Sequence, residues 1–295
     1  NMPIKKKPVF AVIGGSGLYN LENMKILKKL NLNTPFGKPS DKILVGKYKD
    51  LDVLFLPRHG KNHNIAPHKI NYKANIYALK KLGVTDIISI SAVGSLKDKH
   101  KPGDFILVNQ YIDRTFNRGT TFFEDDCVAH VSLANPVTNQ ILDKLYSCKN
   151  TITNLKKGGT YIAIEGPQFS THAESMLYKS FGCDIIGMTN MPEVRLAREA
   201  EVGYASIGMV TDYDCWHNDH EAVTVEDIII VMKKNTIKNK KLLDAFFSKV
   251  IKDSNWNFDD NTYNNLDTAI ITSKKAISIK TKNKLKPILN RYLKN

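Results

Sequence analysis

The sequence predicts a single-domain α/β fold, with a mixed, mostly parallel, twisted sheet flanked by helices. Apolar runs of strand length recur along the 295 residues, and many are continuous rather than alternating. Continuous runs are typical of strands that are covered on both faces. Segments with helical periodicity lie between these runs, and strands that alternate with helices favour a parallel sheet. No repeat and no linker rich in proline, glycine or serine divides the chain, so we expect one domain.

Eight short apolar runs are expected to be strands. In parallel sheets, ligands bind beyond the carboxyl ends of the strands. The segments that follow these strands are therefore where we expect a functional site. In chain order the runs are Val9–Ile13, Ile43–Val45, Val53–Leu56, Ile87–Ile90, Phe105–Val108, Tyr161–Ile164, Ile185–Gly187 and Tyr204–Val210.

Four segments are expected to be helices. The apolar residues of Lys69–Leu82 recur with helical spacing, and Gly83 is placed to end that helix. Thr224 precedes two acidic residues, which is an N-cap pattern, and its helix is expected to run towards Val250. The two shorter candidates are Thr171–Phe181 and Pro192–Ala200, the second with proline in its first turn.

The formal charge of +14 suggests a nucleic-acid-binding protein. The excess charge lies mainly at the ends, because residues 1–7 contribute +3 and residues 274–295 contribute +8. The middle of the chain is nearly balanced and lacks the interleaved basic and aromatic residues of single-strand binding proteins. We therefore do not expect nucleic acid as a partner, and keep a basic nucleic-acid-binding protein as the alternative from another functional class.

The four cysteines are widely spaced and form no C-x-x-C pair, which argues against a disulfide framework and a zinc site. A reducing compartment is the simpler interpretation, so we expect a cytoplasmic protein. No apolar run approaches the roughly 20 residues of a membrane span, so no membrane partner is expected. The first apolar run follows three lysines but breaks at Gly14–Gly15, which favours a strand over a signal peptide.

Three expected strands end in small, hydroxyl or cationic residues: Gly14–Gly17, Arg58–Gly60 and Ser91–Ser95. Glycines let backbone N–H groups face an anion, and arginine offers a planar fork of donors that suits phosphate. Taken singly, the first segment is as well explained by a tight turn, and the second by an arginine paired with a carboxylate. As a set, the three segments predict a site for a tetrahedral oxyanion.

Three further strand ends offer groups for a flat polar ligand. Glu165–Ser170 provides a carboxylate, a turn and an aromatic ring, and Gly187–Asn190 provides a methionine with polar neighbours. Asp212 and Asp214 follow the most apolar strand, and their spacing in extended chain points both carboxylates to one side. Such a pair can divide into a proton donor and a hydrogen-bond acceptor. The alternatives are a structural turn with Phe169 in the core and a solvated acidic loop, and a metal site would need more ligands.

In this order the segments resemble the purine nucleoside phosphorylase superfamily, and within it the trimeric 5′-methylthioadenosine phosphorylases. The resemblance runs from about Val9 to about Ser273. It implies a nucleoside phosphorylase domain with the phosphorylase/hydrolase-like fold over residues 8–273, and a basic C-terminal extension over residues 274–295. The most specific stretches are Thr34–Ser40, Pro57–Gly60, Asn71–Ile76, Glu165–Ser170, Met188–Glu193 and Thr211–Trp216.

The resemblance also implies roles for single residues. Asp212 would hydrogen-bond or protonate the purine N7, and Asp214 would accept from the 6-amino group. His130 would reach the site of a neighbouring subunit in a homotrimer. Phosphate would be held by Ser16, Arg58, His59, Ser91, Thr189 and the backbone of Ala92. The base would contact Phe169 and Ser170, the ribose would contact Met188, and the 5′ group would lie against Val225, Ile228 and Ile229.

The implied reaction is cleavage of the N-glycosidic bond of 5′-methylthioadenosine by phosphate, giving adenine and 5-methylthioribose 1-phosphate. Phosphate is cosubstrate and nucleophile, so no cofactor, metal ion or protein nucleophile is expected. The aspartate pair favours adenine, and Val225 stands where 6-oxopurine enzymes place a histidine near the 5′-hydroxyl. The alternative within the superfamily is a purine nucleoside or methylthioinosine phosphorylase acting on 6-oxopurines. A nicotinamide-dependent oxidoreductase is excluded because Gly14–Gly17 lacks the G-x-G-x-x-G spacing.

Overall fold

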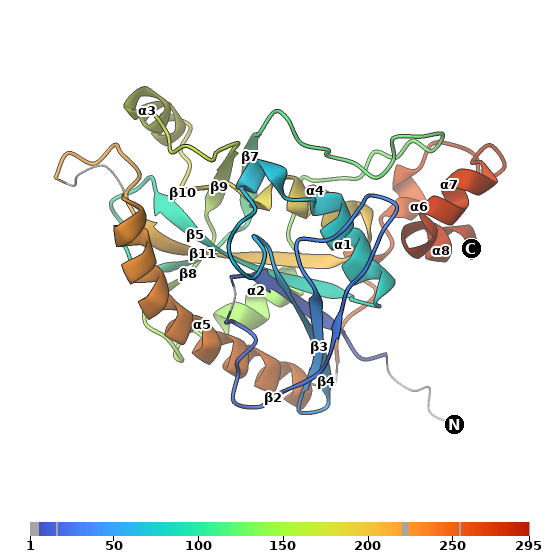
Figure 1. The fold of residues 1–295 in the computed structure, drawn as a ribbon, viewed down its shortest axis with the longest axis horizontal. Coiled ribbons are helices and arrows are strands. Elements are labelled where there is room, and N and C mark those ends of the chain that lie inside the picture. Colours follow the sequence, from blue (N-terminus) through green and yellow to red (C-terminus); the bar gives the residue numbers. More distant parts are fainter. Residues whose placement is uncertain (1–5, 16, 220–223, 254, 295) are drawn as a thin grey trace.

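The central sheet of the computed structural model has eleven strands, counted over residues 6–15, 17–219, 224–253 and 255–294, which the structure describes. Helices cover both faces of this sheet (Figure 1). In chain order the strands are β1 (Phe10–Gly14), β2 (Met24–Leu30), β3 (Ile43–Tyr48), β4 (Leu51–Pro57), β5 (Asp86–Ser95), β6 (Phe105–Leu107), β7 (Gln110–Arg114), β8 (Leu155–Lys157), β9 (Thr160–Ile164), β10 (Ile185–Gly187) and β11 (Gly203–Asp212).

The order along the sheet is β2-β3-β4-β1-β5-β10-β9-β7, and β11 pairs with β5 and with β6, which in turn pairs with β8. The centre is parallel, because β1 pairs with β4 and β5 in parallel and β11 pairs with β5 in parallel. Strand β10 runs antiparallel to β5, and β3 is antiparallel to β2 and β4. The sheet is therefore mixed and centrally parallel, which confirms the expected fold class.

All eight expected strands are present, but β2, β7 and β8 were not expected. Strands β2 and β7 end the main strand order, and among the described strands β8 pairs only with β6. Their sequences are rich in polar residues, and most side chains of β2 and β7 are exposed or half-buried. Strands at a sheet edge need no continuous apolar run, so the pattern that identified the central strands does not detect them.

The four expected helices are present within a larger set. Within the described residues, no helix is both long enough and apolar enough to cross a membrane. The helices are α1 (Tyr72–Lys81), α2 (Asn139–Tyr146), α3 (His172–Ser180), α4 (Asn190–Glu199), α5 (Val225–Lys252), α6 (Leu266–Ala269), α7 (Ile279–Lys284) and α8 (Lys286–Lys294), with 3-10 turns η1 (Pro67–Lys69) and η2 (Asn261–Tyr263).

Side-chain caps explain where two of these helices begin. Helix α1 starts three residues later than expected because the Asn71 side chain accepts from the N–H of Ala74 and forms the N-cap. Thr171 and Glu174 form a reciprocal capping box at the start of α3, and Thr171 is the residue at which this helix was expected to begin. Capping groups therefore set the boundaries where the apolar pattern alone is ambiguous.

The helices form two layers with separate apolar cores. On one face, residues of α1, α4 and α8 pack against the sheet, including Ile76, Val194 and Ile288. On the other face, α2 and the long α5 pack against it through residues such as Leu142 and Phe246. In Figure 1, α5 runs along one side of the sheet while α1 and α4 lie on the other. The carboxyl ends of the central strands stay open between these layers.

Part of the Lys-rich segment 274–295 forms α7 and α8, which lie beside α1 (Figure 1). Ile288 and Leu289 are fully buried there. Arg291 pairs with Glu201 at 2.6 Å and with Asp267 at 2.8 Å. The apolar face of this segment thus belongs to the core, and part of its positive charge is neutralised within the fold.

Candidate active site

A cavity of about 260 Å³ opens at the carboxyl ends of the central strands. Residues in the carboxyl-terminal parts of β5 and β11, and at or just beyond the ends of β1, β4, β9 and β10, contribute to its wall, and residues of α5 line one side. Of the residues expected at the site, ten line this cavity. They are Arg58, His59, Ser91, Ala92, Phe169, Met188, Thr189, Asp212, Asp214 and Ile228.

Two hydroxyl groups of the cavity wall have no partner within the described residues. The Oγ atom of Ser91 and the Oγ1 atom of Thr189 are buried and make no hydrogen bond there. Because a buried polar group without a partner is costly, both hydroxyls are suited to a bound polar ligand. Ser16 lies outside the described residues, and its neighbour Gly15 lines the cavity.

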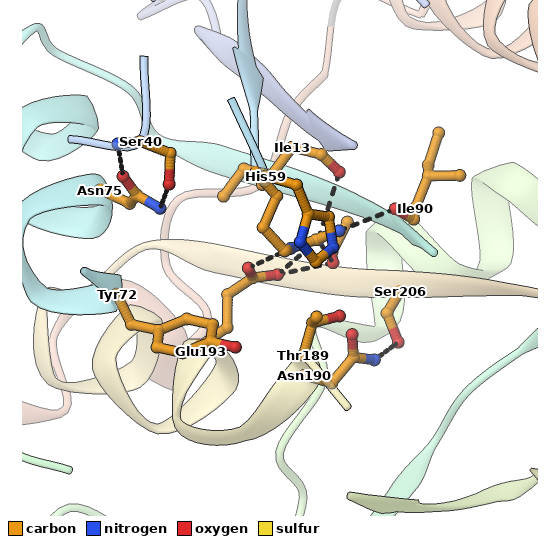
Figure 2. Close-up of polar contacts among 12 residues, drawn as sticks. Ile13, Ser40, His59, Tyr72, Asn75, Ile90, Thr189, Asn190, Glu193 and Ser206 are labelled. Atoms are coloured by element: carbon orange, nitrogen blue, oxygen red, sulfur yellow. Dashed lines mark hydrogen bonds and ion pairs between the residues drawn. The ribbon is translucent and has the colours of Figure 1, made fainter. Parts of the chain in front are cut away.

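Arg58 follows β4 and is only 1% exposed. Its Nε and Nη2 atoms donate to the two carboxylate oxygens of Glu193 at 2.9 and 3.0 Å. Nη1 donates to the carbonyl of Ile90 at 3.0 Å, one of the dashed contacts in Figure 2. Within the described residues, these bonds leave one N–H of Nη1 without an assigned partner, so pairing with a carboxylate and binding an anion are compatible roles for Arg58.

His59 lies beside Arg58 on the cavity wall. Its Nδ1 is 2.8 Å from the carbonyl oxygen of Ile65, so Nδ1 carries the proton and Nε2 is left for a ligand. Burial lowers the pKa of His59 to about 4, and the nearby charges of Arg58 and His63 act in the same direction. The ring of His63 stacks on His59 with centroids 4.4 Å apart and also lines the cavity. Sequence reasoning missed His63, for which the spacing of four residues was the only signal.

Asp212 and Asp214 also belong to the cavity wall. Asp212 accepts from Thr211 Oγ1 at 2.6 Å and from the N–H of Asp214 at 2.7 Å. Burial raises the pKa of Asp212 to about 6, and burial also raises the pKa of Asp214, which is 7% exposed. The acidic loop is therefore buried rather than solvated. The close approach of β5 depends on Gly94, because a Cβ there would lie 2.9 Å from Asp212 Oδ1.

Phe169 and Ser170 differ in position. Phe169 is 46% exposed and lines the cavity, so it is not a core residue. The backbone carbonyl of Ser170 accepts from Cys215 Sγ at 3.4 Å, and Ser170 is not part of the lining. Met188 lines the cavity and contacts the turn at Gly166, where a Cβ would lie 2.5 Å from the Met188 sulfur.

On α5, the cavity is lined by Ile228 and by Met232, which stands one turn later. Val225 is 62% exposed and Ile229 is 46% exposed, and neither is part of the lining. Residues four apart share a helix face, and this places Met232, which sequence reasoning missed, beside Ile228. The contacts expected for Val225 and Ile229 remain predictions.

His130 is exposed and lies away from the cavity of its own chain. Its N–H donates to the carbonyl of Ala269 at 2.9 Å, next to a bridge between Ala129 and Ile270. These contacts hold the segment of His130 against the end of α6, at Ala269 and Ile270. The expected reach of His130 into a neighbouring subunit remains a prediction.

Comparison with known proteins supports a shared family. Residues 9–248 match the model described as the phosphorylase superfamily. The S-methyl-5′-thioadenosine phosphorylase of Rhodospirillum rubrum is 48% identical over 271 residues, covering 90% of this chain and 91% of that protein. A solved methylthioadenosine phosphorylase from an antarctic soil metagenomic library matches with a TM-score of 0.89 and 41% identity, covering 97% of this chain and 100% of its own.

A variant of the adenosine/methylthioadenosine phosphorylase of Schistosoma mansoni, solved in complex with methylthioadenosine, matches with a TM-score of 0.81 and 34% identity. The match covers 88% of this chain and 96% of that one. The matches extend over most of each chain, and their sequence identities lie well above the level at which two proteins share only a fold. The chain therefore belongs to the phosphorylase superfamily, and within it to the S-methyl-5′-thioadenosine phosphorylase family.

Proposed function

We propose that this protein cleaves the N-glycosidic bond of 5′-methylthioadenosine with inorganic phosphate, releasing adenine and 5-methylthioribose 1-phosphate. The observation that carries this is the arrangement of one cavity. The hydroxyls of Ser91 and Thr189, which have no hydrogen-bond partner in the described part of the chain, lie with Arg58 in its wall, and the same wall holds the buried carboxyls of Asp212 and Asp214. Donors for an anion and an acid for a leaving base are thus combined in a single space.

The chemistry needs both groups. As the glycosidic bond breaks, positive charge develops on the ribose and negative charge on the base. Phosphate bound by Arg58, Ser91 and Thr189 supplies both the nucleophile and a stabilising negative charge beside the ribose. Asp212 would give a proton or a hydrogen bond to N7, and its raised pKa of about 6 favours the protonated form that this requires. The reaction in this form needs no protein nucleophile.

Adenine is favoured by the aspartate pair. With N7 bound by Asp212, the carboxylate of Asp214 would accept from the 6-amino group, and a 6-oxo group offers no such donor. The printed names of the relatives, S-methyl-5′-thioadenosine phosphorylase and adenosine/methylthioadenosine phosphorylase, support the same choice. The 5′ substituent would lie against Ile228 and Met232, where a thioether is buried more favourably than a hydroxyl, by about 1–3 kcal/mol.

A substrate panel tests this proposal. Methylthioadenosine, adenosine, methylthioinosine and inosine are each assayed for base release with and without phosphate. We expect the highest kcat/KM for methylthioadenosine, and strict dependence on phosphate. A preference for the 6-oxopurines would support the alternative within the superfamily, and release of base without phosphate would indicate a hydrolase.

We also propose a homotrimer in which His130 approaches a neighbouring cavity, because His130 is exposed and held by the His130–Ala269 contact rather than by its own cavity. Light scattering measures the mass in solution, and a monomer at the assay concentration contradicts this assembly.

A cytoplasmic location is supported by the four free cysteines. The proposed phosphorylase domain covers residues 8–273, and α7 and α8 of the proposed C-terminal extension pack against it, because Ile288 and Leu289 belong to the same apolar core.

A further inference from the structure

A long loop between β7 and α2 reaches the candidate active site from outside the cavity. Residues 115–138 form no helix or strand apart from the bridge at Ala129. Figure 1 shows this loop passing from β7 towards the C-terminal helices and back. Loops of this length in compact domains are usually functional when they are ordered. The contacts of Arg118 indicate what this loop does.

Arg118 is buried, with a side chain that is 2% exposed. Its Nε donates to Glu165 Oε1 at 2.5 Å, and Nη2 donates to the backbone carbonyl of the same residue at 2.7 Å. Its Nη1 donates to the carbonyls of Met188 and Met191 at 2.6 and 2.7 Å, and to the hydroxyl of Tyr72 at 3.0 Å. One guanidinium therefore joins the segment after β9 to the segment after β10.

These two segments carry proposed contacts to both substrates. The segment after β9 leads from Glu165 to Phe169, the proposed contact of the base, and the segment after β10 carries Met188 and Thr189. Arg118 itself is not part of the cavity lining. Its influence on substrate must therefore pass through the backbone carbonyls that it binds.

The loop is fastened on both sides of Arg118. The Oε2 atom of Glu165 accepts from the N–H groups of Phe116 and Asn117 at 3.0 and 2.8 Å. Farther along, Glu199 accepts from the N–H of Phe122 at 2.7 Å and from Thr121 Oγ1 at 2.6 Å. Because the backbone before and after Arg118 is held, its guanidinium has a defined position.

We propose that Arg118 is a positioning residue that holds Phe169, Met188 and Thr189 in the geometry that nucleoside and phosphate require. The inference rests on the proposed function. Lysine cannot replace arginine here, because its donors radiate from a single nitrogen and cannot reach carbonyls of both segments. A displacement of about 1 Å at a reacting centre can cost about 100-fold in rate, so loss of Arg118 should be severe.

The test compares Arg118→Met and Arg118→Lys with a matched control, Arg291→Met. The control also removes an arginine–glutamate ion pair, between Arg291 and the buried Glu201, and neither residue is part of the cavity lining. We expect both Arg118 variants to lose about 100-fold in kcat/KM, with a raised KM for nucleoside and for phosphate. Arg291→Met is expected to lower the melting temperature and to leave both KM values unchanged.

A rescue experiment separates positioning from general stability. Guanidinium chloride at millimolar concentration should restore part of the activity of Arg118→Ala, and sodium chloride at the same concentration should not. If the Arg118 variants do not fold, Glu165→Gln is measured instead, and it should raise KM for nucleoside about tenfold, since a hydrogen bond to a charged group contributes about 1.5 kcal/mol.

Wild-type kinetics in a folded Arg118 variant, or in folded Glu165→Gln where the Arg118 variants do not fold, would overturn the proposal. An inactive wild-type protein in the same assay would instead refute the proposed function.

Discussion

Glu193 binds Arg58 through both of its carboxylate oxygens, at 2.9 and 3.0 Å, inside the core behind the candidate active site. Oε1 also accepts from Ser89 Oγ at 2.6 Å and from the Tyr204 hydroxyl at 2.8 Å. The carboxylate is 1% exposed and the guanidinium side chain 2% exposed. Glu193 thus fixes the orientation of the arginine that faces the proposed phosphate position.

Substitution Glu193→Gln tests this relationship. It leaves the buried charge of Arg58 without its counter-charge, so we expect a loss of about 3 kcal/mol in the free energy of unfolding. Glutamine keeps the shape and one acceptor, so KM for phosphate should rise less than in Glu193→Ala, which also frees the arginine to move. Denaturant unfolding and phosphate saturation kinetics measure the two effects. Equal KM values for the two variants would show that orientation by Glu193 does not matter.

Asp212→Asn separates the proposed acid from the rest of the site. An amide cannot transfer a proton to N7, and general acid catalysis is worth about 10²–10⁴-fold, so turnover of methylthioadenosine should fall within that range. The same amide can also donate to the 6-oxo oxygen of inosine, which a carboxylate cannot do, so the ratio of inosine to methylthioadenosine turnover should rise. Kinetics on both substrates give the ratio. Unchanged kinetics with methylthioadenosine would show that the acid has been wrongly assigned.

The sequence predicted those cavity-lining residues that come at the end of an apolar strand. Arg58, Ser91 and Asp212 each stand at the end of an apolar run, and the parallel arrangement of β4, β5 and β11 then places those ends at one edge of the sheet. Their proximity follows from topology, and topology follows from the alternation of strands and helices.

The partners of these residues were not predictable in the same way. Glu193 is 135 positions from Arg58 and lies inside a helix, where a glutamate is usually solvent-facing. Arg118 is a single arginine in a polar loop. Its position depends on hydrogen bonds that this loop donates to the carboxylates of Glu165 and Glu199, which only the folded chain brings near. The local sequence pattern identifies residues at the ends of strands. It carries no signal for hydrogen-bonded pairs of residues that are far apart in the sequence, such as Arg58 with Glu193.

Ile228→Ala tests the proposed 5′ pocket. Removing apolar surface from the cavity wall should weaken contact with a methylthio group by about 1–2 kcal/mol, which is about 5- to 30-fold in kcat/KM. Adenosine, which has no methylthio group, should lose much less. The matched control is Ile229→Ala, because Ile229 is the next residue of α5 but is 46% exposed and outside the lining. If both variants lose the same activity with methylthioadenosine, Ile228 does not discriminate the 5′ group.

The pH dependence of stability tests the environment of Asp212. Its pKa is raised from 3.8 to about 6 chiefly by burial, so folding favours the protonated carboxyl. The stability contributed by this preference is fully present below pH 3.8 and is lost as the pH rises through about 6. Asparagine has no charge to bury, so Asp212→Asn should be more stable than the wild type at pH 8, by on the order of 2 kcal/mol.

At pH 4 this advantage should vanish, because the carboxyl is then protonated in the folded state and, like the amide, carries no charge, while an oxygen that can accept from the N–H of Asp214 is present in both proteins. Urea unfolding of both proteins at about pH 4, 6 and 8 gives the difference in the free energy of unfolding directly. Thr211→Val serves as the control, since it removes a hydrogen bond to Asp212 and leaves the carboxyl in place. A stability difference between Asp212→Asn and wild type that does not change with pH would mean that the Asp212 carboxyl titrates as an exposed group, and its assignment as the acid would lose its physical basis.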